Sequence, residues 1–273
     1  MKKVLFVCDG DNFPKGAIEF MKWMNENEPV QAKGIFFTPV DFQQLINVSY
    51  IPVARPYIKL KKNEKKLVRQ SKEKFINACE ASNIKCQADE HEEEDKNLLI
   101  KESRFADILL ISEELFCSDY VYEQPNVFMK EILHGAECPV IVVPETFSSP
   151  DRIVVAYDGR KESMISLKQF CYLLPQLTKL PAEFVYVKNE ESEDIPEQGL
   201  LKEYVKAHFN SIGVLKLHFD AHKYFAVWAE TKKNILLVAG SYSRSAVSDL
   251  LHSSFAEQII HEHKIPVFIA HHG

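Results

Sequence analysis

The sequence predicts an α/β protein of two similar domains, each a five-stranded, mostly parallel sheet with helices on both faces. Three observations lead to this prediction. The chain of 273 residues repeats itself, and short apolar runs alternate with longer segments of helical periodicity. The apolar runs show no polar alternation, which is typical of strands buried on both faces.

The repeat divides the chain into halves. Three pairs of segments match: "KVLFVCDG" (3–10) with "RIVVAYDG" (152–159), "DILLIS" (107–112) with "NILLVA" (234–239), and "EILHGAECPVIVV" (131–143) with "QIIHEHKIPVFIA" (258–270). A stretch with turn-forming residues, "ETFSSPD" at 145–151, separates the two copies. We therefore predict a first domain at 1–147 and a second at 148–273.

The second half shows the order of elements, and the first half follows the same order. Expected strands lie at 152–157, 182–188, 214–219, 234–240 and 266–270. Expected helices lie at 161–174, 200–213 and 223–232, with a last helix that reaches His263. We expect the helix at 200–213 to end at Gly213, because glycine commonly closes helices.

Composition and charge exclude several classes of protein. Hydrophobic residues make up 46% of the chain and charged residues 26%, which is ordinary for a globular protein, and the net charge of -6 does not favour nucleic acid. The six cysteines form no C-x-x-C pair, which favours a reducing compartment. The first apolar run reaches Asp9 too soon for a signal peptide, and no apolar run approaches the ~18 residues of a membrane helix. We expect a cytoplasmic protein without a membrane partner.

One charged segment needs its own interpretation. Residues 54–75 hold nine Lys or Arg and two Glu, and the acidic stretch "DEHEEED" follows at 89–95. We interpret the basic run as a solvated helix face, with a phosphate- or membrane-binding patch as the alternative.

The candidate ligand site lies where strands of the second half end. Asp158, Val187 and Gly240 each end an apolar run, and a hydroxyl-rich stretch follows Gly240 in "LLVAGSYSRSAVSDLLHSSF". In open α/β sheets, ligands bind at the carboxyl ends of strands, at the point where the strand order reverses. A glycine there permits positive φ and close approach, so that successive N–H groups can point at an anion.

These features resemble a tandem universal stress protein of the UspA-like family, over nearly the whole chain. The resemblance implies Rossmann-like domains of the adenine nucleotide alpha hydrolase-like kind. Nucleotide-binding members carry Gly-x-x-Gly, nine residues, then Gly-Ser or Gly-Thr. The same spacing here gives Gly240, Ser243 and Ser253-Ser254, so serine replaces two of the three glycines.

The resemblance also implies roles for individual residues. Asp158 would face the adenine or ribose of ATP or AMP, and the main chain of Val187 would contact the base. The phosphates would be held by Gly240, Ser241, Ser243, Arg244, Ser253 and Ser254. Hydroxyls can donate to phosphate and Arg244 can add a charge-assisted bond, but serine adopts positive φ at a cost of about 1–2 kcal/mol.

The first half lacks these features. Glu113 stands where the second half has Gly240, Phe116 where it has Ser243, and Asn126-Val127 where it has Ser253-Ser254. A carboxylate at this place disfavours phosphate. We expect no nucleotide in the first half, and we interpret Asp9 as a turn residue before Gly10.

We expect a stress-response binding and regulatory module, not an enzyme, that senses ATP or AMP in its second half and acts through unknown protein partners. The last strands, "PVIVV" and "PVFIA", are edges whose pairing would join the halves into an internal pseudo-dimer, and a further homodimer stays open. One alternative is a scaffold that binds no nucleotide, which the serine replacements favour. Another is a slow ATP hydrolase, for which Asp249 and Glu257 are the only carboxylates in 240–257.

No metal or redox cofactor is expected. The "HEH" at 261–263 lacks the H-E-x-x-H spacing that places two imidazoles on one helix face.

Overall fold

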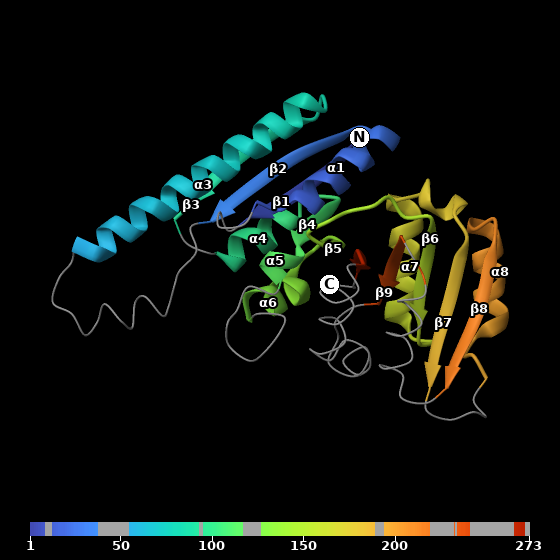
Figure 1. Ribbon diagram of the computed structural model, residues 1–273. Helices are drawn as coiled ribbons and strands as arrows, with labels where there is room; N and C mark the ends of the chain where they lie inside the picture. Colours follow the sequence, from blue (N-terminus) through green and yellow to red (C-terminus); the bar gives the residue numbers. More distant parts are fainter. Residues whose placement is uncertain are drawn as a thin grey trace.

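The described strands form one sheet in the order β3-β2-β1-β4-β5-β10-β9-β6-β7-β8 (Figure 1). The computed structural model describes residues 1–8, 13–37, 55–92, 95–116, 127–188, 194–218, 232, 234–240 and 265–270. The first half contains β1 (Lys2–Cys8), α1 (Lys15–Asn27), β2 (Val30–Phe37), α3 (Arg55–Ala81), β3 (Lys85–His91), α4 (Lys96–Ser103), β4 (Ile108–Ser112), α5 (Glu113–Phe116), α6 (Val127–Gly135) and β5 (Val140–Val143). The second half contains β6 (Arg152–Tyr157), α7 (Lys161–Leu173), η1 (Leu177–Lys179), β7 (Ala182–Lys188), α8 (Gln198–His208), β8 (Ile212–His218), β9 (Ile235–Ala239) and β10 (Val267–Ile269).

The predicted fold class is confirmed. Within each half, five strands pair in parallel, and the third strand along the chain lies at the outer edge while the fifth lies at the centre of the whole sheet. The predicted division at residues 147 and 148 falls in the connection between β5 and β6. The exact boundary stays a sequence-based prediction.

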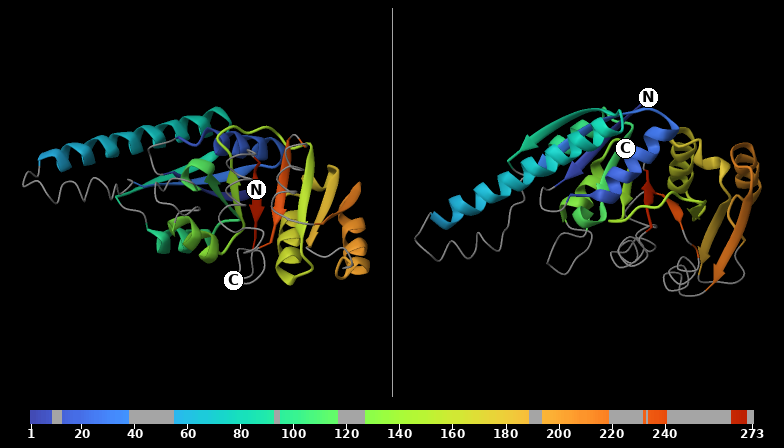
Figure 2. Two further views of the ribbon diagram at one scale, coloured as in Figure 1. Left: turned by 60° about the horizontal axis from the view of Figure 1, so that its bottom comes forward. Right: turned by 45° about the horizontal axis from the view of Figure 1, so that its top comes forward.

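Helices cover the sheet on two faces (Figures 1 and 2). One hydrophobic core joins α1, α3, α7 and α8 to one face, where side chains such as Phe6, Phe75 and Phe170 are buried. A second core joins α4, α5 and α6 to the opposite face. The helix expected before His263 lies outside the described residues, and so does the helix expected at 223–232 except for Lys232.

The two halves meet where β5 and β10 pair antiparallel, with Phe268 opposite Ile141. This confirms the predicted pairing of the last strands. Phe268 is fully buried, and its ring stands edge-on to that of Phe170, with centroids 5.5 Å apart. Each half therefore covers the edge that the other would otherwise expose, which removes a row of unpaired backbone groups.

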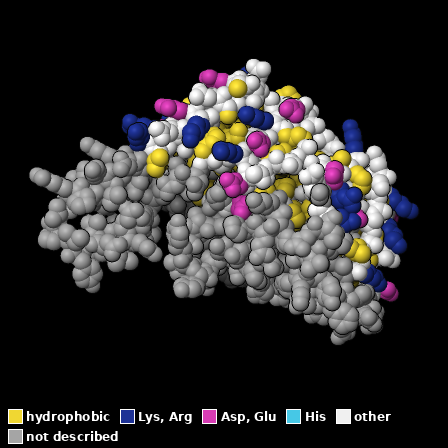
Figure 3. Space-filling model, in the orientation of Figure 1, with side chains coloured by type: hydrophobic (Ala, Val, Ile, Leu, Met, Phe, Trp, Pro, Cys, Tyr) yellow, Lys and Arg dark blue, Asp and Glu magenta, His cyan; other side chains and the backbone are white. Residues whose placement is uncertain are grey.

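The basic segment forms much of α3, a helix of 27 residues and thus about 40 Å long. Its N-terminal part runs past the edge of the sheet (Figures 1 and 2). Where its side chains are described, Val68 and Phe75 face the core, while Lys65 pairs with Glu92 and Lys72 with Glu90 at 3.0 Å. The acidic stretch thus neutralises part of the basic run, and both signs are interspersed on the face in Figure 3.

Within the residues that the structure describes, no helix is both long enough and apolar enough to cross a membrane.

The short helix α4 begins after Asp95, whose carboxylate accepts the backbone N–H of Leu98 at 3.1 Å. This is an N-cap, which satisfies one of the donors that a helix leaves free at its start.

The expected end of α8 was wrong. The helix ends at His208, and Gly213 lies inside β8. Phe209 takes an extended conformation (φ -116°, ψ 141°) and buries its ring against Phe184, with centroids 5.9 Å apart. Burial of this aromatic ring ends the helix before the glycine is reached, and tertiary packing overrides the local signal.

Candidate functional site

The candidate site lies at the carboxyl ends of β6 and β9. These strands are neighbours, with Val155 opposite Val238, whereas the chain continues from β6 to β7 on the other side. The strand order therefore reverses at β6, and in open α/β sheets the crevice outside the carboxyl ends of the strands at such a reversal is where ligands bind. Asp158 and Gly240, the residues that directly follow β6 and β9, are brought to this place as predicted.

Asp158 holds a turn with one carboxylate oxygen. Its Oδ1 accepts the backbone N–H of Arg160 at 2.9 Å. Its Oδ2 is buried and has no hydrogen-bond partner in the described part of the chain, and the Arg160 Nε lies 4.0 Å away. The side chain is 15% exposed. One oxygen therefore stabilises the turn, while the other is available to a donor.

The glycine after Asp158 is required by the turn itself. Gly159 has a φ of +82°, and a Cβ there would lie 2.6 Å from the Cβ of Pro196. Both the left-handed backbone and the close approach exclude larger residues. The Asp-Gly pair that ends the repeated segment is thus a structural turn signal.

Position 240 needs glycine for a different reason from the one expected. The structure assigns it no left-handed φ; instead, it packs against the first turn of α7. A Cβ there would lie 2.9 Å from the backbone nitrogen of Ser163 and 3.2 Å from the carbonyl carbon of Glu162. Gly240 therefore lets the end of β9 approach the start of α7, and the expectation of positive φ at Gly240 is corrected.

The start of α7 faces the same end of the sheet. Arg160 is its N-cap residue, and its own side chain makes no capping hydrogen bond. Ser163 donates its hydroxyl hydrogen to the carbonyl of Arg160 at 2.8 Å. The N–H groups at a helix start and the helix dipole favour an anion at such a position.

Three residues beside this site were not predicted from the sequence to belong to it: Tyr157, Gly159 and Pro196. Tyr157 donates its hydroxyl hydrogen to the carbonyl of Pro196 at 3.1 Å, which ties the segment before α8 to the end of β6. Burial raises the pKa of Tyr157, and the carboxylates of Glu197 and Asp158 raise it further, so the phenol stays a donor at neutral pH. No local pattern marks Pro196, but the "YDG" triplet was a usable signal for Tyr157 and Gly159.

The remaining predicted site residues are placed only in part. Val187 lies one residue beyond the last β6–β7 pair, Tyr157 with Tyr186, and opposite Leu217 of β8. Its main chain is therefore at the same end of the sheet as Asp158. The other predicted contacts lie outside the described residues: Ser241, Ser243, Arg244, Ser253 and Ser254.

The corresponding end of β4 in the first half is built differently. Glu113 follows β4 directly, and its buried carboxylate accepts the backbone N–H of Glu145 at 3.3 Å. The hydroxyl of Ser112 accepts the backbone N–H of Leu115 at 3.1 Å. Side chains of the protein thus occupy donors at this strand end. Asp9 and Asn126 lie outside the described residues, and of Phe116 and Val127 only the backbone is described.

Metal ligands do not cluster in the part of the chain that the structure describes: no group of three or more His, Cys, Asp or Glu side chains there could hold an ion. The histidines at 261–263 are not among these residues.

Solved structures of universal stress proteins share this fold over the whole chain. A universal stress protein from Archaeoglobus fulgidus matches with a TM-score of 0.71 and 15% identity, covering 100% of this chain and 97% of that chain. A putative universal stress protein from Pseudomonas aeruginosa matches with a TM-score of 0.56 and 11% identity, covering 99% of this chain and 93% of that chain. The chain therefore has the Rossmann-like fold of these proteins, as the sequence resemblance implied.

Smaller structures match about half of the chain. One is a universal stress protein family protein from Arabidopsis thaliana with AMP bound, at 16% identity and a TM-score of 0.35, covering 53% of this chain and 92% of that chain. A match at this level carries no argument about the ligand of this chain. No protein-family model and no curated protein matches the chain.

Proposed function

We propose that the chain is a cytoplasmic universal stress protein whose second half binds ATP or AMP in a crevice at the carboxyl ends of β6 and β9. It would act as a binding and regulatory module, through protein partners, and not as an enzyme. The observation that supports this most strongly is the Asp158 Oδ2, a buried carboxylate oxygen without a hydrogen-bond partner among the described residues, at the reversal of strand order.

An adenine nucleotide supplies what this oxygen lacks. A buried acceptor without a donor costs about 1–3 kcal/mol, and more when it is charged. A ribose hydroxyl or the adenine amino group would donate to Oδ2 while Oδ1 continues to hold the turn at Arg160. The start of α7 and the serine-rich stretch after Gly240 would then serve the phosphates.

The serine replacements set an expectation for affinity. If Ser243 and Ser253 must adopt positive φ, each costs about 1–2 kcal/mol relative to glycine. Their hydroxyls offset part of this cost by donating to phosphate oxygens. We therefore expect micromolar or weaker binding at one site per chain.

Isothermal titration of the purified chain with ATP and with AMP tests the proposal. Asp158→Asn keeps the acceptor for Arg160 N–H but removes the charge, so it should preserve the turn and weaken nucleotide binding about 10- to 100-fold. Asp9→Asn changes the equivalent residue of the first half and is the matched control, which should bind as the unchanged chain does. Ser254→Ala should weaken ATP binding more than AMP binding, because it is expected to contact the phosphates.

The same samples distinguish the nucleotide sensor from the two alternatives, a scaffold and an ATP hydrolase. Absence of binding heat up to millimolar nucleotide would overturn the proposal of a nucleotide sensor and would favour a scaffold. Steady release of phosphate from ATP, above that of a sample without protein, would instead indicate hydrolysis and contradict a non-enzymatic role.

A further inference from the structure

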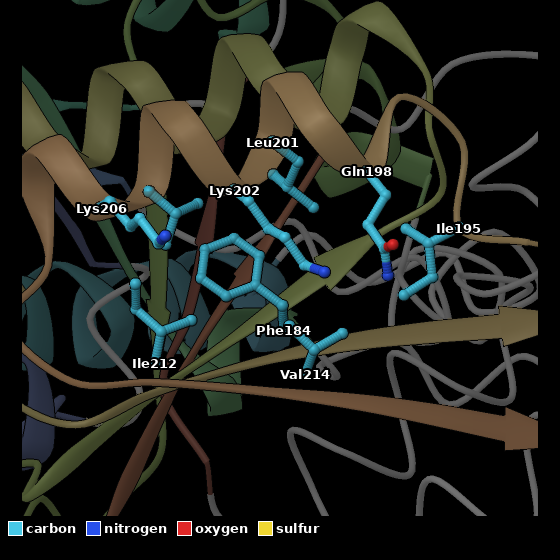
Figure 4. Close-up of a pocket in the computed structure, with 9 residues that line it drawn as sticks. Phe184, Ile195, Gln198, Leu201, Lys202, Lys206, Ile212 and Val214 are labelled. Atoms are coloured by element: carbon cyan, nitrogen blue, oxygen red, sulfur yellow. The ribbon is translucent and has the colours of Figure 1, made fainter.

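A cavity of about 320 Å³ lies at the outer edge of the second half, between α8 and the strands β7 and β8 (Figure 4). It is separate from the crevice at β6 and β9. Leu201, Lys202 and Lys206 reach it from α8, while Phe184, Ile212 and Val214 reach it from the strands. Pockets that hold small organic molecules measure roughly 300–1,000 Å³, so the cavity falls at the small end of this range.

The walls of the cavity are apolar and partly open to solvent. Phe184, Leu201 and Ile195 are buried, but Val214 of the edge strand β8 is 44% exposed. A large aliphatic side chain with this exposure is unfavourable, because it leaves apolar surface in water. A ligand with an apolar body would cover this surface.

The corresponding place in the first half, at the other edge of the sheet, is built from α3 and β3. There α3 packs against β3, where Cys86 and Ala88 are partly buried against the core. Ion pairs between α3 and the end of β3, such as Lys72 with Glu90 at 3.0 Å, hold the two elements together. The shorter α8 has no such pairs with β8 in the described part of the chain.

The rim of the cavity is basic. Lys202 and Lys206 lie one helical turn apart on α8, both exposed, and neither forms an ion pair within the described residues. Like charges four residues apart on a helix repel each other. On β8, Lys216 is already paired with Asp194 at 3.5 Å. Two amines above an apolar floor, without an ion-pair partner in the described part of the chain, favour a ligand that carries a negative head.

We propose that this cavity binds a small, soluble, amphipathic organic anion: an apolar chain with a carboxylate or a similar anionic head at Lys202 and Lys206. One water takes about 30 Å³ in the liquid, so the volume suits a molecule of roughly ten non-hydrogen atoms. This inference does not depend on nucleotide binding. Ile195, in the cavity wall, is next to Pro196, which contacts Gly159, so the experiments below use samples without nucleotide.

Octanoate, which has a linear apolar chain and a carboxylate, is the probe, and 1-octanol is the matched neutral probe. Calorimetric titration should give one octanoate site per chain with a Kd below about 1 mM, and 1-octanol should bind at least fivefold more weakly. In ¹H–¹⁵N spectra, octanoate should shift the signals of Leu201, Ile212 and Val214.

Two variants test the contributions of the anionic head and of the apolar body of the ligand separately. Lys202→Gln with Lys206→Gln should weaken octanoate at least fivefold and leave 1-octanol unchanged. Val214→Trp should fill the cavity from the exposed edge and remove binding of both probes. Lys66→Gln with Lys101→Gln removes two exposed amines from the first half and should change neither.

Several results would overturn the proposal. Failure of octanoate to bind at 5 mM would do so. Octanoate binding that equals that of 1-octanol and is unaffected by the loss of Lys202 and Lys206 would do so as well. Sedimentation could show a dimer that Val214→Trp dissociates while octanoate does not bind, in which case a second copy of the chain covers β8. Binding to vesicles of anionic phospholipid without binding of free octanoate would assign the surface to a membrane instead.

Discussion

Replacement of Gly240 by alanine tests why this position needs glycine. The added Cβ would lie 2.9 Å from the backbone nitrogen of Ser163 and 3.1 Å from its Cα, both closer than the ordinary contact of 3.4 Å. These atoms belong to the first turn of α7 and are held by the helix. Either β9 or α7 must therefore shift by several tenths of an ångström, because no flexible side chain can yield.

The cost follows from the packing. An extra methyl group in a closely packed interior costs about 1–3 kcal/mol. For a domain of 150–250 residues, each kcal/mol lowers the Tm by about 2–4 °C. We therefore expect Gly240→Ala to lower the free energy of unfolding by about 1–3 kcal/mol and to lower the Tm by several degrees.

Urea unfolding followed by circular dichroism measures the change, with Gly199→Ala as the matched control. A Cβ at Gly199, near the start of α8, meets nothing within 4 Å. Alanine there should leave stability unchanged or raise it by about 0.4–1 kcal/mol, since it restricts the unfolded chain. A Gly240→Ala chain as stable as the parent, or equal losses in both variants, would refute the packing explanation.

Three further predictions concern stability. Phe268→Ala should lower the free energy of unfolding in urea by about 3–5 kcal/mol, because the ring is fully buried at the junction of the halves. The control Phe105→Ala, at a side chain 63% exposed, should change this free energy by less than about 0.5 kcal/mol. Similar losses in the two variants would contradict the prediction. Asp95→Ala removes the N-cap of α4 and should cost about 1 kcal/mol, and an unchanged urea midpoint would count against it. Burial raises the pKa of Cys138 from 9.0 to about 12, so the folded chain keeps a proton that the unfolded chain loses above pH 9. Stability should then fall by up to about 1.4 kcal/mol per pH unit above pH 9, and Cys138→Ala should flatten this slope between pH 9 and pH 10.5; an identical slope would show that this thiol does not contribute.

Local patterns in the sequence were sufficient for the architecture. The apolar runs without polar alternation predicted the central strands, and the repeat predicted that both halves share one strand order. The apolar last strands also predicted the β5–β10 pairing, because an unpaired edge of this composition is unfavourable in water. The turn at Asp158 was not predicted, although the Asp-Gly pair after β6 carries a signal for it.

Contacts between distant segments could be known only from the tertiary structure. The end of α8 depends on the place where Phe209 meets Phe184, and the need for glycine at 240 depends on how closely α7 approaches β9. The hydrogen bond between the carboxylate of Glu113 and the backbone of Glu145 also depends on how distant segments pack together. Periodicity in a sequence reports which face of an element is buried, because that follows from the geometry of a single helix or strand. It does not report the distance between elements, because the packing of all side chains together sets that distance. The cavity at α8 and β8, and the oxygen of Asp158 that has no hydrogen-bond partner among the described residues, are therefore visible only in the folded chain.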